Sequence, residues 1–139
     1  LLPEIVVPVC APGLMHSPLE NPVDILGFDL LHLDTRPRGW ARWLRAVGLP
    51  DRPRQGMVFD QFSTMAQAAI HGLGIALLPT FVAEPYLSEG QLVLASARTS
   101  ESIGSYYLVW PQDRPETKAM ASFREWLAEQ ANTPQEASP

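Results

Sequence analysis

A single cysteine, Cys10, is all that the 139 residues contain, and this excludes an intrachain disulfide and a metal site built from cysteines. Cys10 lies in an apolar run, where a small buried thiol is expected. No apolar stretch approaches the ~20 residues that cross a bilayer. No basic segment followed by an apolar one opens the chain, as it would in a secretory signal. The sequence therefore predicts a cytoplasmic protein with no membrane partner.

Positive charge is also scarce. The chain has 10 Lys and Arg against 15 Asp and Glu, a formal net charge of -5 and a sequence pI near 5.1. A large nucleic-acid surface needs clustered basic residues to displace counterions from phosphate. We therefore do not expect this chain to bind DNA directly. Hydrophobic residues make up 46% of it, enough for the core of one modest domain, or of one lobe plus part of another.

Catalytic motifs are missing as well. Ser63 does not lie in a G-x-S-x-G elbow, and His16, His32 and His71 have no second His or Cys at metal-binding spacing. The glycines of residues 72–74 follow a helical pattern, whereas a dinucleotide-binding loop follows a strand and opens a helix. The sequence thus predicts no catalytic residue, no metal and no cofactor, and the chain is not expected to be an enzyme.

Short buried strands alternate with helices along the chain. This alternation implies βαβ units and an α/β fold whose sheet is covered on both faces. Strands are expected at 4–12, 30–33, 56–60, 75–79, 91–95 and 105–111. Helices are expected at 22–27, capped by Asn21, at 40–47, from the 60–64 turn to Gly72, at 81–90 and at 117–131.

Two of these helices carry apolar stripes. Trp40, Trp43, Leu44 and Val47 recur at helical spacing, which favours burial in a core or interface. The terminal helix has its own stripe, made of Met120, Phe123, Trp126 and Leu127. Residues beyond Asn132 offer no apolar anchor and are expected to be disordered.

The helix after residue 60 has three candidate caps. Thr64 has capping-box spacing with Gln67, and Asp60 and Ser63 are further candidates, so the choice stays open. Gly72 and Gly74 allow a left-handed exit. Its inward stripe is predicted to be Phe62, Ala66, Ala69, Ile70 and Leu73.

Polar loops follow three of the strands, at residues 34–36, 60–64 and 79–81. Ligands of open α/β sheets bind beyond the carboxyl ends of the strands, where helix N-termini present free N–H groups. A small polar or anionic molecule is therefore a candidate ligand. Helix capping explains Asp60, Ser63 and Thr64 equally well, and for Arg36 a plain surface charge is the favoured interpretation before any resemblance is considered.

The order of motifs in residues 59–95, "FDQFSTMAQAAIHGLGIALLPTFVAEPYLSEGQLVLA", is more specific than any one of them. A polar turn, an Ala-rich helix, G-x-G-I/V-A-L-L/A-P and L-x-x-G-x-L-V follow one another. This order resembles the effector-binding domain of LysR-type transcriptional regulators. "EIVVPVCAPGL", "YYLVWP" and "FREWLAEQ" resemble the flanking strands and terminal helix, and "HLDTRPRGWARWLRAVGLP" resembles the glycine-cleavage-activator subgroup.

The resemblance implies a periplasmic-binding-protein-like (type 2) lobe, with a mixed sheet flanked by helices. It divides the chain into a strand connecting from lobe one (1–9), the second lobe (10–105), the returning strand and C-terminal helix of lobe one (106–131), and a disordered tail (132–139). The chain is expected to be a fragment. A winged helix-turn-helix that binds DNA, and the first half of lobe one, would lie outside it.

The resemblance also implies a homo-oligomeric regulator that senses a small effector between its lobes, with amino acids and small carboxylates as candidates. A solute-binding protein of the same fold is the alternative, and would need a signal peptide upstream. Ala11 stands where family members often have serine, which removes a hydroxyl from that loop. The effector-binding residues carried over are Ala11, Pro12, Asp34, Thr35, Gln61, Phe62, Ser63, Thr64, Pro79, Thr80, Phe81 and Tyr106.

Overall fold

The computed structural model describes residues 2–107, 109, 112–113 and 115–132, so the tail predicted to be disordered lies outside it apart from Asn132. The chain divides into two compact units. One comprises Glu4–Ile103, and the other combines the first three residues with the segment from Gly104 onward. No helix among the described residues has the length and apolar character needed to cross a membrane. The division into lobes expected from the resemblance stays a prediction.

The larger unit is built on a mixed sheet with the strand order β3-β2-β4-β1-β5, and β6 also pairs with β1. β2 is parallel to both β3 and β4, whereas β1 is antiparallel to β4 and β5. The strands are β1 (Leu2–Cys10), β2 (Leu30–Leu33), β3 (Val58–Phe59), β4 (Ile75–Pro79), β5 (Val93–Leu94) and β6 (Ser100–Tyr106).

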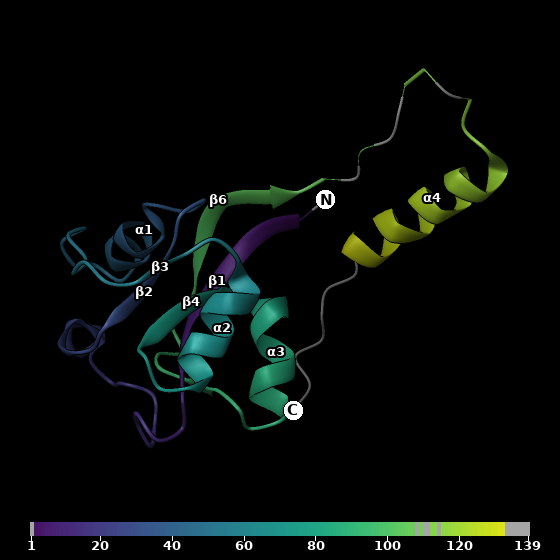
Figure 1. Ribbon diagram of the computed structural model, residues 1–139. Helices are drawn as coiled ribbons and strands as arrows, with labels where there is room; N and C mark the ends of the chain where they lie inside the picture. The colour runs from purple at the N-terminus through teal and green to yellow at the C-terminus, as the bar shows by residue number, and fades with distance from the viewer. Residues whose placement is uncertain (1, 108, 110–111, 114, 133–139) are drawn as a thin grey trace. The chain divides into compact units, whose positions relative to one another are not determined.

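Helices cover both faces of this sheet, which confirms the predicted α/β class (Figure 1). Successive residues of a strand point to opposite faces, so Val7 and Val9 pack in one core cluster and Val6 and Cys10 in the other. The first cluster includes buried residues of α2 (Phe62–Ile70) and α3 (Thr80–Ser88). The second includes residues of α1 (Gly39–Ala46) and of the 3-10 helix η1 (Pro22–Gly27), which Asn21 caps as predicted.

The predicted tryptophan stripe forms the buried face of α1. Trp40 and Trp43 are 2% and 0% exposed, and their rings meet edge to face at 5.7 Å. A buried indole needs a partner for its N–H group. Trp40 Nε1 donates to the Leu31 carbonyl oxygen at 2.8 Å and Trp43 Nε1 to that of Arg98 at 3.0 Å, so both rings fix α1 to the rest of the unit.

Two details of α2 differ from the sequence-based expectation. The N-cap is Gln61, whose side chain makes no capping bond, so none of the three candidate caps was right. Thr64 Oγ1 instead donates to the Gln61 carbonyl oxygen at 3.0 Å. Leu73 is 47% exposed and was wrongly placed in the inward stripe. The helix ends at Ile70 and Gly72 turns the chain with a φ of 80°, so the helical spacing does not reach Leu73.

The last strand was placed too late in the sequence. β6 is Ser100–Tyr106, whereas the prediction was 105–111, and part of that range (108, 110 and 111) lies outside the described residues. The sequence "SESIGSY" has no alternation of apolar and polar residues that would predict a strand. It forms a strand because its backbone pairs with β1.

In the smaller unit, α4 (Lys118–Asn132) matches the predicted terminal helix within one residue at each end. Thr117 Oγ1 accepts a hydrogen bond from the Met120 amide at 3.2 Å, as a helix cap does. Phe123 and Trp126 stack at 6.0 Å and are each about half exposed, at 54% and 53%. The predicted apolar stripe therefore exists, and three of its side chains, Met120, Phe123 and Trp126, are exposed.

Candidate functional site

The carboxyl ends of β3, β2 and β4 meet at one edge of the sheet, because these three neighbours are parallel. The register pairs Leu33 with Phe59, and the Asp34 amide donates to the Phe59 carbonyl oxygen at 2.8 Å. The segments that follow the three strands consequently start side by side; a loop follows β2, α2 begins shortly after β3, and α3 begins directly after β4. This edge is where ligands of open α/β sheets bind.

Most of the residues singled out in the sequence lie directly after those strands, in a connecting loop or in the first turn of the helix that follows. Asp34 and Thr35 follow β2, Gln61, Phe62, Ser63 and Thr64 follow β3, and Thr80 and Phe81 follow β4. Most of these side chains are exposed; Phe62 is half-buried, and Pro79, at the end of β4, is buried. Ser63 Oγ lies 3.4 Å from Gln61 Oε1. The turn at the start of α2 thus presents an amide and two hydroxyls at the edge of the sheet.

The structure separates Ala11 and Pro12 from this group. β1 runs antiparallel to β4, with Val6 opposite Pro79 and Val9 opposite Ala76. The start of β1 therefore lies at the carboxyl edge of β4, and the loop after Cys10 lies at the opposite edge. The placement of Ala11 and Pro12 with the other residues was wrong for that reason. Tyr106 ends β6 in the smaller unit, and its side chain is outside the described part.

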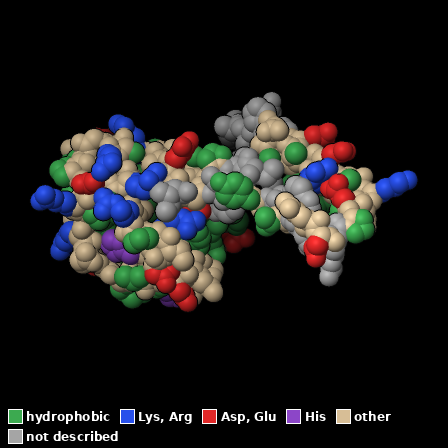
Figure 2. Space-filling model, turned by 90° about the horizontal axis from the view of Figure 1, so that it is seen from above, with side chains coloured by type: hydrophobic (Ala, Val, Ile, Leu, Met, Phe, Trp, Pro, Cys, Tyr) green, Lys and Arg blue, Asp and Glu red, His purple; other side chains and the backbone are tan. Residues whose placement is uncertain are grey.

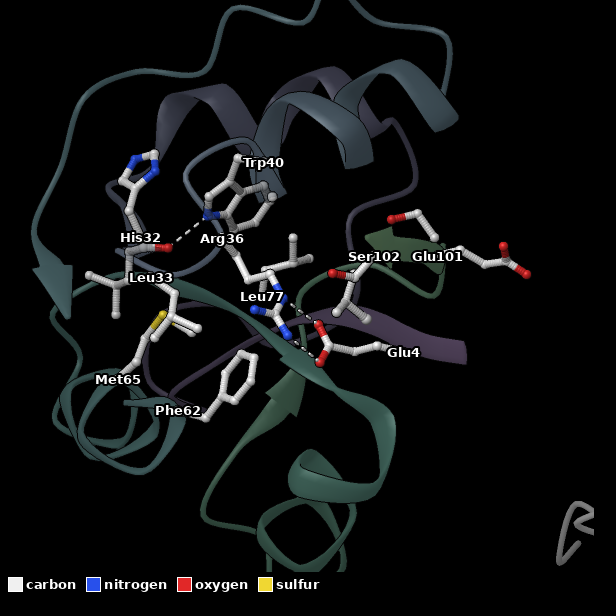
Figure 3. A pocket seen from close by; sticks show the side chains of 14 residues that line it. Glu4, His32, Leu33, Arg36, Trp40, Phe62, Met65, Leu77, Glu101 and Ser102 are labelled. Atoms are coloured by element: carbon white, nitrogen blue, oxygen red, sulfur yellow. Dashed lines mark hydrogen bonds and ion pairs between the residues drawn. The ribbon is translucent and has the colours of Figure 1, made fainter. Parts of the chain in front are cut away.

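The same antiparallel pairing brings Glu4 to the edge, a residue that sequence reasoning missed. Its side chain is 1% exposed and accepts two hydrogen bonds from Arg36, from Nε to Oε1 and from Nη2 to Oε2, both at 3.1 Å. Figure 3 shows the two side chains facing each other. Carboxylates are almost never buried without a partner. A glutamate that begins an apolar strand could therefore have predicted a buried ion pair at this position. Arg36 is accordingly more than the surface charge it resembled.

A small cavity adjoins this ion pair. About 20 Å³ of it is open to the centre of a water molecule, which is room for about one water. Phe62 and Met65 border it from α2 and Trp40 from α1 (Figure 3). Ser100 also lines it, and the buried Ser100 Oγ has no hydrogen-bond partner within the described residues. The cavity joins the predicted turn at Phe62 to the ion pair.

The one cysteine is buried, and two of the three histidines lie against backbone carbonyl groups. Burial raises the pKa of the Cys10 thiol to about 11, which suppresses the nucleophilic thiolate. His32 Nε2 lies 3.0 Å from the Arg54 carbonyl oxygen, and His71 Nδ1 lies 2.7 Å from that of Gln67. Within the described part of the chain, His, Cys, Asp and Glu form no group of three that fits a metal ion.

The topology and this polar edge define a class, the periplasmic-binding-protein-like effector-binding domains. The family model described as LysR substrate binding domain matches residues 1–132, and the chain belongs to this family. Among solved structures, the effector domain of the transcriptional regulator AmpR of Pseudomonas aeruginosa is 34% identical, with a TM-score of 0.79 over 94% of this chain and 63% of that one. The AmpR effector-binding domain from Citrobacter freundii is 36% identical, with a TM-score of 0.79 over 94% and 65%.

Two curated relatives are named activators. The HTH-type transcriptional activator AmpR of Rhodobacter capsulatus is 43% identical over 124 residues, which is 89% of this chain and 42% of the relative. The glycine cleavage system transcriptional activator of Escherichia coli is 34% identical over 139 residues, 98% of this chain and 45% of the relative. The chain thus spans less than half the length of these relatives. Their names are those of regulators and not of enzymes.

Proposed function

We propose that this chain is the small-molecule-sensing part of a LysR-type DNA-binding transcriptional regulator. The observation that carries the proposal is the shared carboxyl edge of β3, β2 and β4, which presents the exposed polar turn before α2 beside the loop after β2. The family match and the regulators named above support the role in transcription. They also weigh against the alternative of a solute-binding protein.

The wall of the proposed effector cleft consists of residues that the sheet brings together. Tyr106 is included for a different reason. A variant of the Citrobacter freundii effector-binding domain has a serine and a tyrosine substituted, and these two residues are 43 positions apart. Ser63 and Tyr106 have the same spacing, so we propose that they correspond to that pair. Ala11 and Pro12 are left out because they lie at the other edge. The proposed contacts are Asp34, Thr35, Gln61, Phe62, Ser63, Thr64, Pro79, Thr80, Phe81 and Tyr106.

The mechanism we propose is a change in the angle between two lobes when a small effector, such as an amino acid or a carboxylate, binds between them. A ligand shifts this equilibrium only by as much as it prefers one arrangement over the other. In a homo-oligomer the change in angle alters the spacing of DNA-reading helices, which belong to a winged helix-turn-helix outside this chain. The regulator acts in the cytoplasm, needs no cofactor and catalyses no reaction.

Substitution of the turn tests this role in the full-length regulator. Ser63→Ala and Thr64→Ala each remove one exposed hydroxyl from the proposed wall, while Ser88→Ala removes one from the far end of α3 as a matched control. The first two variants should lose effector-dependent activation of a reporter and keep basal promoter binding, whereas the control should keep both. Unchanged induction in both turn variants would remove this turn from the effector site.

A further inference from the structure

Positive charge is concentrated in one segment of this acidic protein. Six of its ten basic residues fall within residues 36–54, where Asp51 is the one acidic residue. Six positive charges and one negative charge give the segment +5, against -5 for the whole chain. Figure 2 shows basic side chains gathered on the visible face of the larger unit. Such separation of charge raises the local concentration of anions.

Three of these arginines line a hollow beside the Glu4–Arg36 pair. Arg36, Arg38 and Arg42 border it together with Pro37, Gly39 and Ser102, and no acidic residue is among the lining residues that the structure describes. About 180 Å³ is open to the centres of water molecules, many times the room that one water needs. The hollow lies at the start of α1, where the helix dipole also favours negative charge. The arginines therefore line a concave space and not a flat surface.

The arginines of the hollow are only partly neutralised. Arg38 shares the carboxylate of Asp51 with Arg45, at 3.4 Å and 2.7 Å respectively. Arg42 is exposed and has no ion-pair partner among the described residues. The hollow therefore keeps a surplus of positive charge.

Arg36 is fixed by hydrogen bonds that use only three of its five N–H groups. A guanidinium has five N–H groups. Nε and Nη2 each use one on Glu4, and Nη1 uses one on the Thr35 carbonyl oxygen at 3.1 Å. One N–H group on each terminal nitrogen has no partner among the described residues. A carboxylate or phosphate, whose oxygens accept from two guanidinium nitrogens at once, fits such donors.

A second donor lies in the neighbouring cavities. Ser100 is 9% exposed and its buried hydroxyl has no partner within the described residues. Ser100 lines the small cavity that also contains Arg36, and a second hollow that also contains Arg42. Glu101 lines both of these spaces, whereas it does not line the hollow of Arg36, Arg38 and Arg42. A buried polar group without a partner is costly, so a water molecule or a polar group of a ligand is expected beside Ser100 Oγ.

We propose that the hollow lined by Arg36, Arg38 and Arg42 binds a small polyanion that carries carboxylate or phosphate groups. Arg36, oriented by Glu4, is its fixed anchor, and Arg42 is its unpaired charge. The inference goes beyond the proposed function, because none of the described residues that line this hollow is among the proposed effector contacts.

Calorimetric titration of the 139-residue chain at low ionic strength tests the proposal, with citrate and inorganic phosphate as separate probes and uncharged glycerol as the blank. One saturable site is expected for at least one of the two anions, and the comparison assigns carboxylate or phosphate chemistry. Arg42→Gln should raise Kd about tenfold, the loss of one charge-assisted hydrogen bond. Arg52→Gln removes the same charge at a residue that does not line the hollow, and should change Kd by less than about twofold.

Arg42 is exposed on α1, so its replacement by glutamine, a comparable helix former, leaves the fold intact. A second variant, Arg36→Gln with Glu4→Gln, removes the anchor without leaving a buried charge, and should also raise Kd about tenfold. Equal weakening by Arg42→Gln and Arg52→Gln would overturn the proposal, as would the absence of saturation by either anion at about 10 mM. Binding to a DNA duplex without binding to citrate or phosphate would overturn it too, in favour of a macromolecular partner.

Discussion

The Glu4 carboxylate and the Arg36 guanidinium form two hydrogen bonds of 3.1 Å across 32 positions of sequence, at an edge of the sheet where Glu4 is 1% exposed. This contact fixes the loop after β2 to the start of β1. A buried ion pair stabilises little on balance, because both charges lose water when they are buried. Removing one partner is far more costly than removing both.

Arg36→Gln should therefore lower the free energy of unfolding by about 3 kcal/mol, since it removes the Arg36 guanidinium from a Glu4 carboxylate that stays buried. Adding Glu4→Gln should restore most of that loss, because two amides of similar shape replace two charges. Urea denaturation of the wild type, both single variants and the double variant gives the coupling energy. If the two single losses simply add, the pair has no structural role.

Two glycines near the end of α2 should tolerate alanine differently. Gly72 has a φ of 80° and open space around it, so Gly72→Ala should cost about 1 kcal/mol, the strain of a left-handed alanine. An added Cβ at Gly74 would lie 2.5 Å from the Asp29 carbonyl oxygen, the atom that accepts from the Ile75 amide at 2.8 Å. Gly74→Ala should therefore cost about 3 kcal/mol. Equal losses in thermal or urea unfolding would contradict this account of the β2–β4 junction.

Cys10 should resist thiol reagents until the protein unfolds. Burial raises its pKa from the ordinary 9.0 to about 11, so at pH 8 about one thiol in a thousand is ionised. Because the folded state favours the neutral thiol, Cys10 contributes stability that is present below pH 9 and is lost as the pH rises toward 11. Labelling with a disulfide reagent at pH 8 should be slow in buffer and fast in urea. Rapid labelling in buffer would show that β1 is accessible.

The fold was predictable because its buried strands are short apolar runs and α1 has a tryptophan stripe at helical spacing. Those patterns depend on neighbouring residues alone. β6 was misplaced because its polar sequence becomes a strand only through pairing with β1. Leu73 was misplaced because Gly72 ends the helical spacing one step earlier than the pattern suggests.

The position of the candidate site's residues was predictable only to the extent that it follows from parallel strands. Polar residues after β2, β3 and β4 lie at one edge as expected. The direction of β1 is a property of the whole sheet, so sequence could not show that Ala11 lies at the far edge and Glu4 at the near one. The partner of Arg36 was missed for the same reason, since the two residues approach only through that antiparallel pairing.

Acid should weaken the link between α1 and the loop that follows it. The hydrogen bond from Arg45 holds the pKa of Asp51 below its ordinary 3.8, and the nearby charges of Arg45 and Arg38 act in the same direction. The unfolded chain has no such contacts, so the folded state binds this proton more weakly, and the stabilisation is present above pH 3.8 and lost as the pH falls through the lower, folded-state pKa. Asp51→Asn cannot titrate and serves as the reference. Urea denaturation of wild type and Asp51→Asn between about pH 6 and pH 3 gives the difference in their stability, which should shrink as the pH falls. The same difference should shrink in about 1 M salt, because the three side chains are solvent-accessible and their charges are screened. A difference that stays constant over this range would show that the Asp51 carboxylate does not stabilise the fold through its charge.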